Sequence, residues 1–469
     1  MFSLLILVPL LIVIILNMPP AGMMRKAAFW ACLAMFTGQI VLVLMPNLSA
    51  FEPFFKVDLI VDELSKVVLF CVGLVSATSL LSGEYIIKDE YQKFNFMNLL
   101  LIALAGMNGV IMVKDVFSLY VFLEITAVAS FILISLGRDM GGLEAAFKYL
   151  ILSAIASVIM LSSISLLLLL SGDTSFAGIN AAIMTSPHSH LIMFAMGLFV
   201  CGLFIKGGLM PFHGWLPYAY SAAPAPVSIL LAGIVTKTAG IYSLIRIMTL
   251  VFAFNDPIKY VLLFVGAASI ILGAFAAMGQ SDFKRMLAYS SISQMGYIVI
   301  GLGCGTMLGI FGAVFHLLNH AVFKTLLFVN AAAVESQAGT RDMDKMSGLA
   351  EKMPITGVTS LIAVLSTAGI PPLSGFWSKF IIILALWLSG HYLYSVIAVI
   401  ASVITLAYML SMQRRIFWGK TAPAFTNVKE AGFLLVLPAL ILAAITVVIG
   451  LIFPFVINMF IQLPDILGG

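Results

Sequence analysis

Long apolar segments, separated by short polar connections, recur along almost the whole chain. Each is about 20 residues long, the length that an α-helix needs to cross the hydrocarbon core of a bilayer. The segments of about ten alternating residues that a transmembrane β-barrel requires are missing from the sequence. The pattern therefore predicts an all-α polytopic membrane protein with about fourteen transmembrane helices.

The composition supports a membrane protein and argues against other classes. Of the 469 residues, 62% are hydrophobic and only 9% are charged, whereas a soluble domain has roughly 25% charged residues. The net charge of +4 is spread over short loops, and there is no nucleic-acid-binding motif. We therefore expect the chain to contact the lipid bilayer and not a nucleic acid. The first apolar run lacks a basic leader and a small-residue cleavage site, which predicts a retained helix.

Two of the apolar segments are interrupted by the same pattern, G-[LI]-x-P-[FL]-x-G-[WF], at residues 208–215 and 369–376. Glycine and proline disfavour the interior of a helix. Interrupted spans in corresponding places are typical of transport sites in proteins built from internal repeats. The residues predicted to break the two helices are Gly208, Pro211, Gly214, Gly369, Pro371, Pro372 and Gly375.

The positions of the two breaks predict the domain organisation. They fall in the seventh and the twelfth predicted spans, and this odd offset of five spans gives the two halves opposite senses in the membrane. We therefore expect two inverted five-helix repeats. Helices 1–3 would occupy residues 1–93, the first repeat 94–252, the second repeat 253–417, and helix 14 with the C-terminus 418–469.

Loop charge predicts the orientation. If the N-terminus lies outside, the cytoplasmic loops carry most of the loop lysines and arginines, and the outside loops carry only Lys56, Lys114 and Lys259. Basic loops are retained on the cytoplasmic side of a membrane. Both termini are therefore predicted to lie on the outer, periplasmic side.

Several ionisable residues fall inside predicted spans. A charge at the bilayer centre costs about 2.5–3.5 kcal/mol on insertion scales, so such residues usually face the protein interior and serve a pathway. For Glu124, a static ion pair is the alternative to a switch, and for Lys206 the alternative is a side chain that reaches the membrane interface. The candidate pathway residues are Glu124, Lys206, Lys237, His316, His320, Lys324 and Lys379.

Three of these candidates share one predicted helix. His316, His320 and Lys324 are spaced four residues apart and so lie on one stripe. Histidines titrate near neutral pH and can relay protons. A helix–helix hydrogen bond through Asn319 or a neighbouring residue is the alternative for His320. A metal site at the two histidines is a further alternative, but the sequence supplies no convincing third ligand for it.

The remaining polar residues support no redox or metal chemistry in this chain. The four cysteines are far apart and form no Cys-x-x-Cys motif, which argues against iron–sulfur or zinc ligation. Any electrons would then travel in another subunit.

Several further polar positions have expected roles. Lys148 is placed on a candidate proton uptake path at the cytoplasmic edge of the sixth span, and Arg246 is expected at the membrane interface. Thr236 and Thr238 are expected to offer hydroxyls to the Lys237 ammonium.

Several stretches together resemble a known family: LYVFLEITAVASFILI, SDFKRMLAYSSISQMGYI, HLLNHAVFKTLLF, LSTAGIPPLSGFWSKF and the long segment around the first break. They are similar to the proton-translocating, antiporter-like subunits shared by respiratory complex I, Mrp sodium/proton antiporters and membrane-bound nickel–iron hydrogenases. The resemblance covers nearly the whole chain. It implies fourteen transmembrane helices with breaks in the seventh and the twelfth.

The resemblance also implies residue roles. Glu124 would be the acid of the fifth span, with Lys206 as its partner, and Lys237 would be the central lysine. Lys379 would be the exit residue, and the eleventh-span relay would be formed by His316, His320 and Lys324.

The resemblance further implies partners and location. The partners would be other membrane subunits, including further antiporter-like ones. Iron–sulfur, nickel–iron or flavin centres would be found only in partner subunits. The location would be the inner membrane of a prokaryotic cell.

Together these features predict a non-redox, ion-translocating subunit of a redox-driven complex, such as a membrane-bound hydrogenase or a complex I-like NADH, quinone or ferredoxin oxidoreductase. Protons would load at Lys237 from the cytoplasm, pass the histidines and leave at Lys379. Movement of the Glu124–Lys206 pair would change the proton affinity of Lys237. The alternative is a D-type subunit of an Mrp sodium/proton antiporter with no link to redox chemistry.

Overall fold

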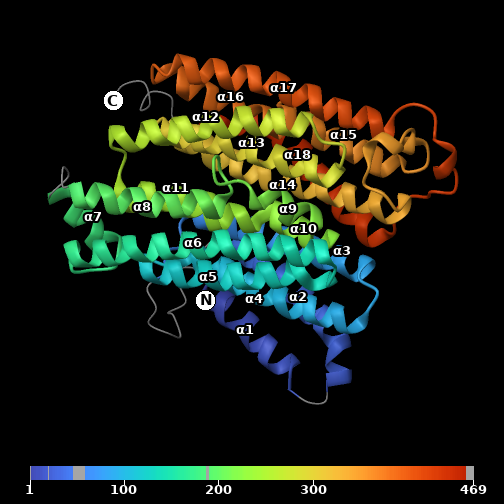
Figure 1. Cartoon of the computed structure of the whole chain (residues 1–469), viewed down its shortest axis with the longest axis horizontal. Coiled ribbons are helices and arrows are strands. Elements are labelled where there is room, and N and C mark those ends of the chain that lie inside the picture. Colours follow the sequence, from blue (N-terminus) through green and yellow to red (C-terminus); the bar gives the residue numbers. More distant parts are fainter. Residues whose placement is uncertain (1, 19–20, 46–58, 186–189, 461–469) are drawn as a thin grey trace. The chain divides into compact units, whose positions relative to one another are not determined.

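The computed structural model describes residues 2–18, 21–45, 59–185 and 190–460. Within these ranges the chain is almost entirely helical, with isolated bridges but no β-sheet (Figure 1). The predicted all-α fold is confirmed, and its cause is elementary. A bilayer core has no water to bond to the backbone, whereas a helix satisfies its own N–H and C=O groups.

The helices have the lengths and compositions of membrane spans. Among the described residues, eleven helical segments are long and apolar enough to cross a membrane, and several shorter apolar helices accompany them. The chain is therefore a multi-pass membrane protein. Lys56, one of the three basic residues predicted on the outer side, lies outside the described residues, as do Met1 and residues 461–469.

The chain divides into two compact units, and the first comprises residues 1–208 and 212–255. Within it, α5 lies beside α4 and α6 (Figure 1). The sequence did not predict the short helix α7. The helices of this unit are α1 (Leu4–Leu16), α2 (Ala21–Leu44), α3 (Glu63–Ile86), α4 (Glu90–Met112), α5 (Val116–Ile134), α6 (Met140–Ser171), α7 (Phe176–Thr185), α8 (His190–Gly207), α9 (Trp215–Ala222), α10 (Ala225–Leu230) and α11 (Ser243–Ile247).

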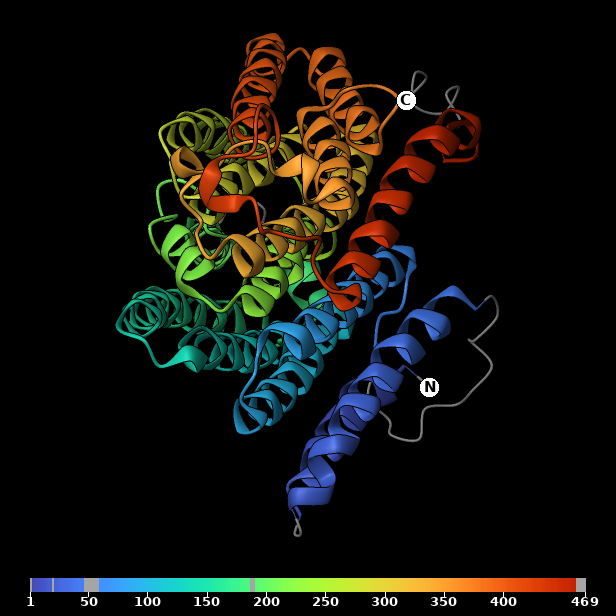
Figure 2. The same cartoon turned by 90° about the vertical axis from the view of Figure 1, so that its right-hand side faces the viewer.

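The second unit comprises residues 209–211 and 256–469. Its helices, yellow-green to red in Figure 2, form one bundle. Helix α14 contacts α13, α15, α16 and α18, so most of its length is buried. The helices of this unit are α12 (Asp256–Met278), α13 (Phe283–Gly303), α14 (Met307–Ala338), α15 (Pro354–Ala368), α16 (Ser374–Leu388), α17 (Tyr392–Phe417) and α18 (Phe433–Phe460).

The helix is interrupted at both copies of the break motif, between α8 and α9 and between α15 and α16. Gly208 and Gly369 have φ angles of +63° and +85°, a left-handed conformation that favours glycine. A Cβ atom on Gly375 would overlap the carbonyl of Ser366. Gly214 differs, because its φ of −55° is ordinary and the space around it is open.

The helical segment that follows α9 is irregular. Between α10 and α11 and after α11 it forms the π-helical turns η3 (Leu231–Val235), η4 (Lys237–Tyr242) and η5 (Met248–Phe252). Such turns are frequent at functional sites. In η4, Gly240 packs directly on the backbone of Gly207, where no side chain would fit. The π-helical turns therefore surround Lys237 with closely packed protein.

Candidate functional site

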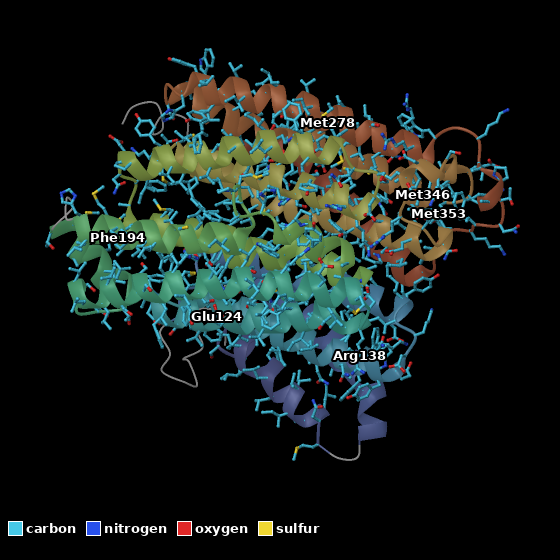
Figure 3. All side chains as sticks on the ribbon, viewed as in Figure 1. Glu124, Arg138, Phe194, Met278, Met346 and Met353 are labelled. Carbon is cyan, nitrogen blue, oxygen red and sulfur yellow. The ribbon has the colours of Figure 1, made fainter. Side chains whose placement is uncertain are left out.

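Glu124 and Lys206 form an ion pair inside the first unit. Glu124 lies midway along α5 (Figure 3), and Lys206 lies in the last turn of α8. The Lys206 Nζ atom is 2.9 Å from Glu124 Oε1, and the side chains are 3% and 31% exposed, respectively. A buried ammonium is costly without a partner, so the carboxylate stabilises Lys206 in place. Lys206 therefore does not reach toward a membrane interface.

Two serines of α6 complete the environment of this pair. Lys206 Nζ donates a hydrogen bond to Ser153 Oγ at 3.3 Å, and the Ser157 hydroxyl donates to Glu124 Oε1. Neither serine was predicted to belong to the site. Their spacing of four residues within an apolar span was an available signal, because residues so spaced lie on one helical face.

Lys237 is a fully buried lysine in the π-helical segment of the first unit. Its side chain is fully buried, and Nζ has no hydrogen-bond partner among the described residues. The expectation that the neighbouring threonines bond its ammonium is wrong. The Thr236 hydroxyl pairs with the Tyr220 hydroxyl at 2.7 Å, and the Thr238 hydroxyl donates to the carbonyl of Val235 at 2.9 Å. The protein thus offers the protonated lysine little fixed stabilisation.

Lys148 is held by local partners on the same unit. Its Nζ atom is 2.6 Å from Glu144 Oε1 and lies 3.6 Å above the ring centre of Tyr218. The side chain is 36% exposed. Lys148 is thus accessible, as an uptake residue must be.

In the second unit, the α14 residues form a buried row. His316, His320 and Lys324 all have 0% exposure. The two imidazole rings are nearly parallel, with centroids 6.2 Å apart, and His316 Nδ1 lies 2.9 Å from Ser378 Oγ of α16. Asn319 makes the helix–helix hydrogen bond, to the carbonyl of Ser374. The row on α14 thus contacts α16 through His316 and Asn319.

Lys324 and Lys379 bind oxygen atoms of the second unit. Lys324 Nζ donates to Ser290 Oγ at 2.7 Å and to the carbonyl of Leu287 at 3.2 Å. Lys379 Nζ donates to the carbonyl of Thr367 at 2.8 Å and lies 4.5 Å from the ring centre of Tyr297. The aromatic face adds a favourable cation–π contact.

The second break creates the site of Lys379. Thr367 lies in the last turn of α15, where a helix leaves carbonyls without internal partners. These carbonyls carry the negative end of the helix dipole, which attracts a cation. At the first break, the indole N–H of Trp215 instead satisfies the carbonyl of Ile205. The two breaks therefore hold different groups, although their sequences are similar.

Two further ion pairs were not predicted. Arg246, which was expected at the interface, is buried and binds both oxygens of Asp62, at 2.6 and 2.8 Å. Lys284, only 2% exposed, lies 2.8 Å from Glu335. Asp62 and Glu335 lie next to the ends of apolar runs, where an acid is ordinarily a solvated loop residue. Their partners come from distant segments, so local spacing gave no signal.

The described residues contain no group of three or more histidine, cysteine, aspartate or glutamate side chains that could hold a metal ion. The four cysteines are unpaired. The absence of a cofactor from this chain stays a prediction.

The family model described as "NADH:quinone oxidoreductase/Mrp antiporter, TM" matches residues 113–405. The D subunit of a Na(+)/H(+) antiporter of Alkalihalophilus pseudofirmus is 32% identical over 397 residues, which cover 84% of this chain and 80% of that protein. The N subunit of the NADH-quinone oxidoreductase of Desulforudis audaxviator is 35% identical over 365 residues, which cover 77% of this chain and 72% of that protein.

Solved structures have the same fold. A chain of the Mrp complex from Dietzia sp. superposes with a TM-score of 0.87 at 26% identity, covering 96% of this chain and 94% of that one. A chain of the membrane-bound sulfane sulfur reductase, an archaeal respiratory membrane complex, gives a TM-score of 0.85 at 27% identity, covering 96% and 75%. The similar proteins thus include both an antiporter and a respiratory complex.

Proposed function

Because the chain belongs to the NADH:quinone oxidoreductase/Mrp antiporter transmembrane family, we propose that it is an antiporter-like membrane subunit of a redox-driven complex, such as a membrane-bound hydrogenase or a complex I-like oxidoreductase, and that it translocates protons. A proton taken up at Lys237 passes to the histidines of α14 and leaves at Lys379. The Glu124–Lys206 pair controls uptake, because a change in its separation alters the charge that Lys237 senses.

The observation that carries this proposal is the buried amine of Lys237. It has no hydrogen-bond partner among the described residues, and an unpaired buried ammonium is costly. A proton is therefore held only while other charges favour it, which is what a carrier requires. Lys206 is already paired with Glu124. This pairing suits a residue that controls proton uptake better than one that carries the proton.

Replacing Lys237 tests the proposal. In the assembled complex reconstituted in liposomes, Lys237→Ala should abolish proton transport while the complex still assembles. Lys66→Ala is a matched control, because the Lys66 side chain is 38% exposed and pairs with Glu63 on its own helix. A Lys237→Ala complex with the proton stoichiometry of the wild type would refute the proposal.

The helix inventory supports about fourteen membrane spans. The eleven long apolar segments, together with α1, α13 and the broken pair α15–α16, account for this number. The order of helices supports two five-helix repeats, since α4, α5, α6, α8–α9 and α10–η5 match α12, α13, α14, α15–α16 and α17, each with its break in the fourth member. The boundary between the two compact units, at residues 255 and 256, is close to the proposed repeat boundary.

The partners in this proposal are other membrane subunits, including further antiporter-like ones. The similar structures are chains of multisubunit membrane complexes, which supports this assignment. Any iron–sulfur, nickel–iron or flavin centre would belong to a partner subunit. The location is the inner membrane of a prokaryotic cell, with both termini on the outer side.

A second candidate function is a D-type subunit of an Mrp antiporter without redox chemistry. The 32% identity to the D subunit of a Na(+)/H(+) antiporter favours it. Proteins that co-purify with the chain in mild detergent distinguish the two candidates. Redox subunits in the purified complex support the first, and a set of antiporter subunits alone supports the second.

A further inference from the structure

A pocket of about 120 Å³ lies in the second unit, where α12 ends beside the last turns of α17. Met278 (Figure 3), Gln280, Tyr408, Ser411 and Arg415 are among its lining residues. Met278 and the Arg415 side chain are 49% and 37% exposed, so the pocket reaches the surface of the unit. A water molecule needs roughly 10–15 Å³ of such volume, so several waters fit.

A short chain of hydroxyl groups connects Tyr408, which lines this pocket, to a buried lysine. The Tyr408 hydroxyl donates a hydrogen bond to Ser290 Oγ at 3.0 Å, and Lys324 Nζ donates to the same oxygen at 2.7 Å. Tyr408 is 5% exposed, whereas Ser290 and Lys324 are 0% exposed. The three groups come from three helices, α17, α13 and α14. The pocket-lining tyrosine is therefore separated from the lysine by one hydroxyl.

We propose that Tyr408 and Ser290 form a hydroxyl relay that loads Lys324 with protons from this pocket. The inference rests on the proposed function and adds to it a second uptake step, which each transport cycle needs together with uptake at Lys237. Lys324 lies one helical turn from His320 on the same stripe, so the proton arrives at the buried row of α14.

The transfer balances as three linked proton movements. When Lys324 is a neutral amine, the Ser290 hydroxyl turns and gives its proton to Nζ. Ser290 receives the Tyr408 proton, and Tyr408 receives one from a hydronium in the pocket, which becomes water. Lys324 ends as an ammonium, both hydroxyls are restored, and no ion remains along the relay.

The position of the pocket agrees with uptake from the cytoplasm. Arg415 in its lining forms an ion pair of 3.2 Å with Asp344 of the loop after α14. This end of the second unit carries the basic loops that the proposed orientation places on the cytoplasmic side. The Lys284–Glu335 pair, on α13 and α14, is the rival inlet that the experiment must separate.

The test removes one hydroxyl at a time from the assembled complex in liposomes. Tyr408→Phe and Ser290→Ala should each slow proton transport about tenfold or more, because each interrupts proton transfer. The slowed step should show a larger solvent deuterium isotope effect, which a purely structural defect would not cause. Ser290→Thr, which keeps the hydroxyl, should restore transport. Tyr392→Phe, at the other end of α17, is the control.

Access to the pocket is tested separately. Ser411→Cys should leave transport intact until a bulky cationic thiol reagent is added. The reagent should then slow transport when it is added on the cytoplasmic side and have no effect from the outer side. Inhibition only from the outer side would overturn the proposal.

Three outcomes identify which idea fails. Wild-type rates in both Tyr408→Phe and Ser290→Ala, with Lys237→Ala inactive, would overturn the relay and leave the proposed function intact. Slow transport in Glu335→Gln with normal transport in Tyr408→Phe would assign uptake to the rival inlet. Normal transport in Lys237→Ala would instead count against the proposed function itself.

Discussion

At the scale of single residues, the buried lysines differ in what compensates their charge. Lys206 has the carboxylate of Glu124, Lys379 has backbone carbonyls, and Lys324 has a serine hydroxyl and a carbonyl. Lys237 has no hydrogen-bond partner among the described residues. Because a proton is held more firmly where its charge is compensated, these lysines suit different roles.

The Glu124–Lys206 pair gives a prediction for stability. Glu124→Gln leaves a buried ammonium without its counter-charge, and breaking a buried pair in this way costs about 3–5 kcal/mol. We expect a cost near the lower end, because Glu124 is 31% exposed. The thermal midpoint of the purified protein in detergent should fall measurably.

Removing both charges is the control for this prediction. The double variant Glu124→Gln with Lys206→Gln should regain most of the lost stability, since no buried charge is left unpaired. Additive losses in the double variant would show that the pair contributes no coupling. Transport should be impaired in the single and the double variants alike.

Asp62 gives a prediction for pH dependence. Burial raises the pKa of its carboxyl, but hydrogen bonds from Arg246 and the Ser65 backbone N–H outweigh this, so its pKa lies well below the usual value. A lowered pKa stabilises the fold above the unfolded value of about 3.9. This stabilisation is lost as the pH falls from about 3.9 through the lowered pKa of the Asp62 carboxyl in the folded protein.

The thermal midpoint of the wild type should therefore fall on acidification below about pH 4. Asp62→Asn keeps a capping side chain for α3 but lacks the titrating group, so its midpoint should be lower at neutral pH and less sensitive to acid. Parallel pH curves for the two proteins would contradict the assignment.

At the scale of elements, the two breaks place functional groups where a continuous helix would bury its carbonyls in internal hydrogen bonds. The break after α15 exposes carbonyls for Lys379, and the break after α8 leaves one that Trp215 satisfies. Similar motifs can therefore serve different purposes. Each break supplies carbonyl acceptors, but the donor is the Lys379 ammonium at one break and the Trp215 indole N–H at the other.

The glycines of the breaks are predicted to differ in tolerance. Gly375→Ala should destabilise the protein by about 1–3 kcal/mol, because the added methyl overlaps the backbone of α15 and forces a shift. Gly214→Ala should change stability by less than about 1 kcal/mol, since its conformation and space accept a side chain. Thermal unfolding of both variants measures this, and equal losses would be inconsistent with it.

At the scale of the whole molecule, each unit presents large apolar side chains on its surface. Phe147 and Leu169 of the first unit are 63% and 80% exposed, and Phe264 and Val403 of the second are 68% and 64% exposed. Such extensive apolar exposure on a water-soluble protein would cause association. Lipid and partner subunits are the surroundings that these surfaces suit.

The proposed orientation predicts which loops face each side. A cysteine at Asp256, whose side chain is 79% exposed, should react with an impermeant maleimide in intact cells. A cysteine at Lys429, which is also exposed, should react only after the membrane is opened. The reverse pattern would invert the topology. Equal labelling of both before the membrane is opened would place the two residues on the same side and exclude an odd number of spans between them.

Much of the fold was predictable because it depends on local physical chemistry. Helix lengths follow from the bilayer thickness, and the breaks at Gly208 and Gly369 follow from residues that leave the helical conformation. The π-helical turns around Lys237 were not predictable, since a tertiary packing preference overrides a sequence that is compatible with a regular helix.

The order of the residues is enough to predict that the chain spans a membrane as helices, where two of these helices break, and which ionisable residues fall inside apolar segments. The partner of each buried charge, from the serines beside Lys206 to Tyr408 and Ser290 beside Lys324, is visible only in the folded chain. The reason is physical. Helical periodicity sets the face on which a residue lies, but contacts between distant segments depend on how the helices pack.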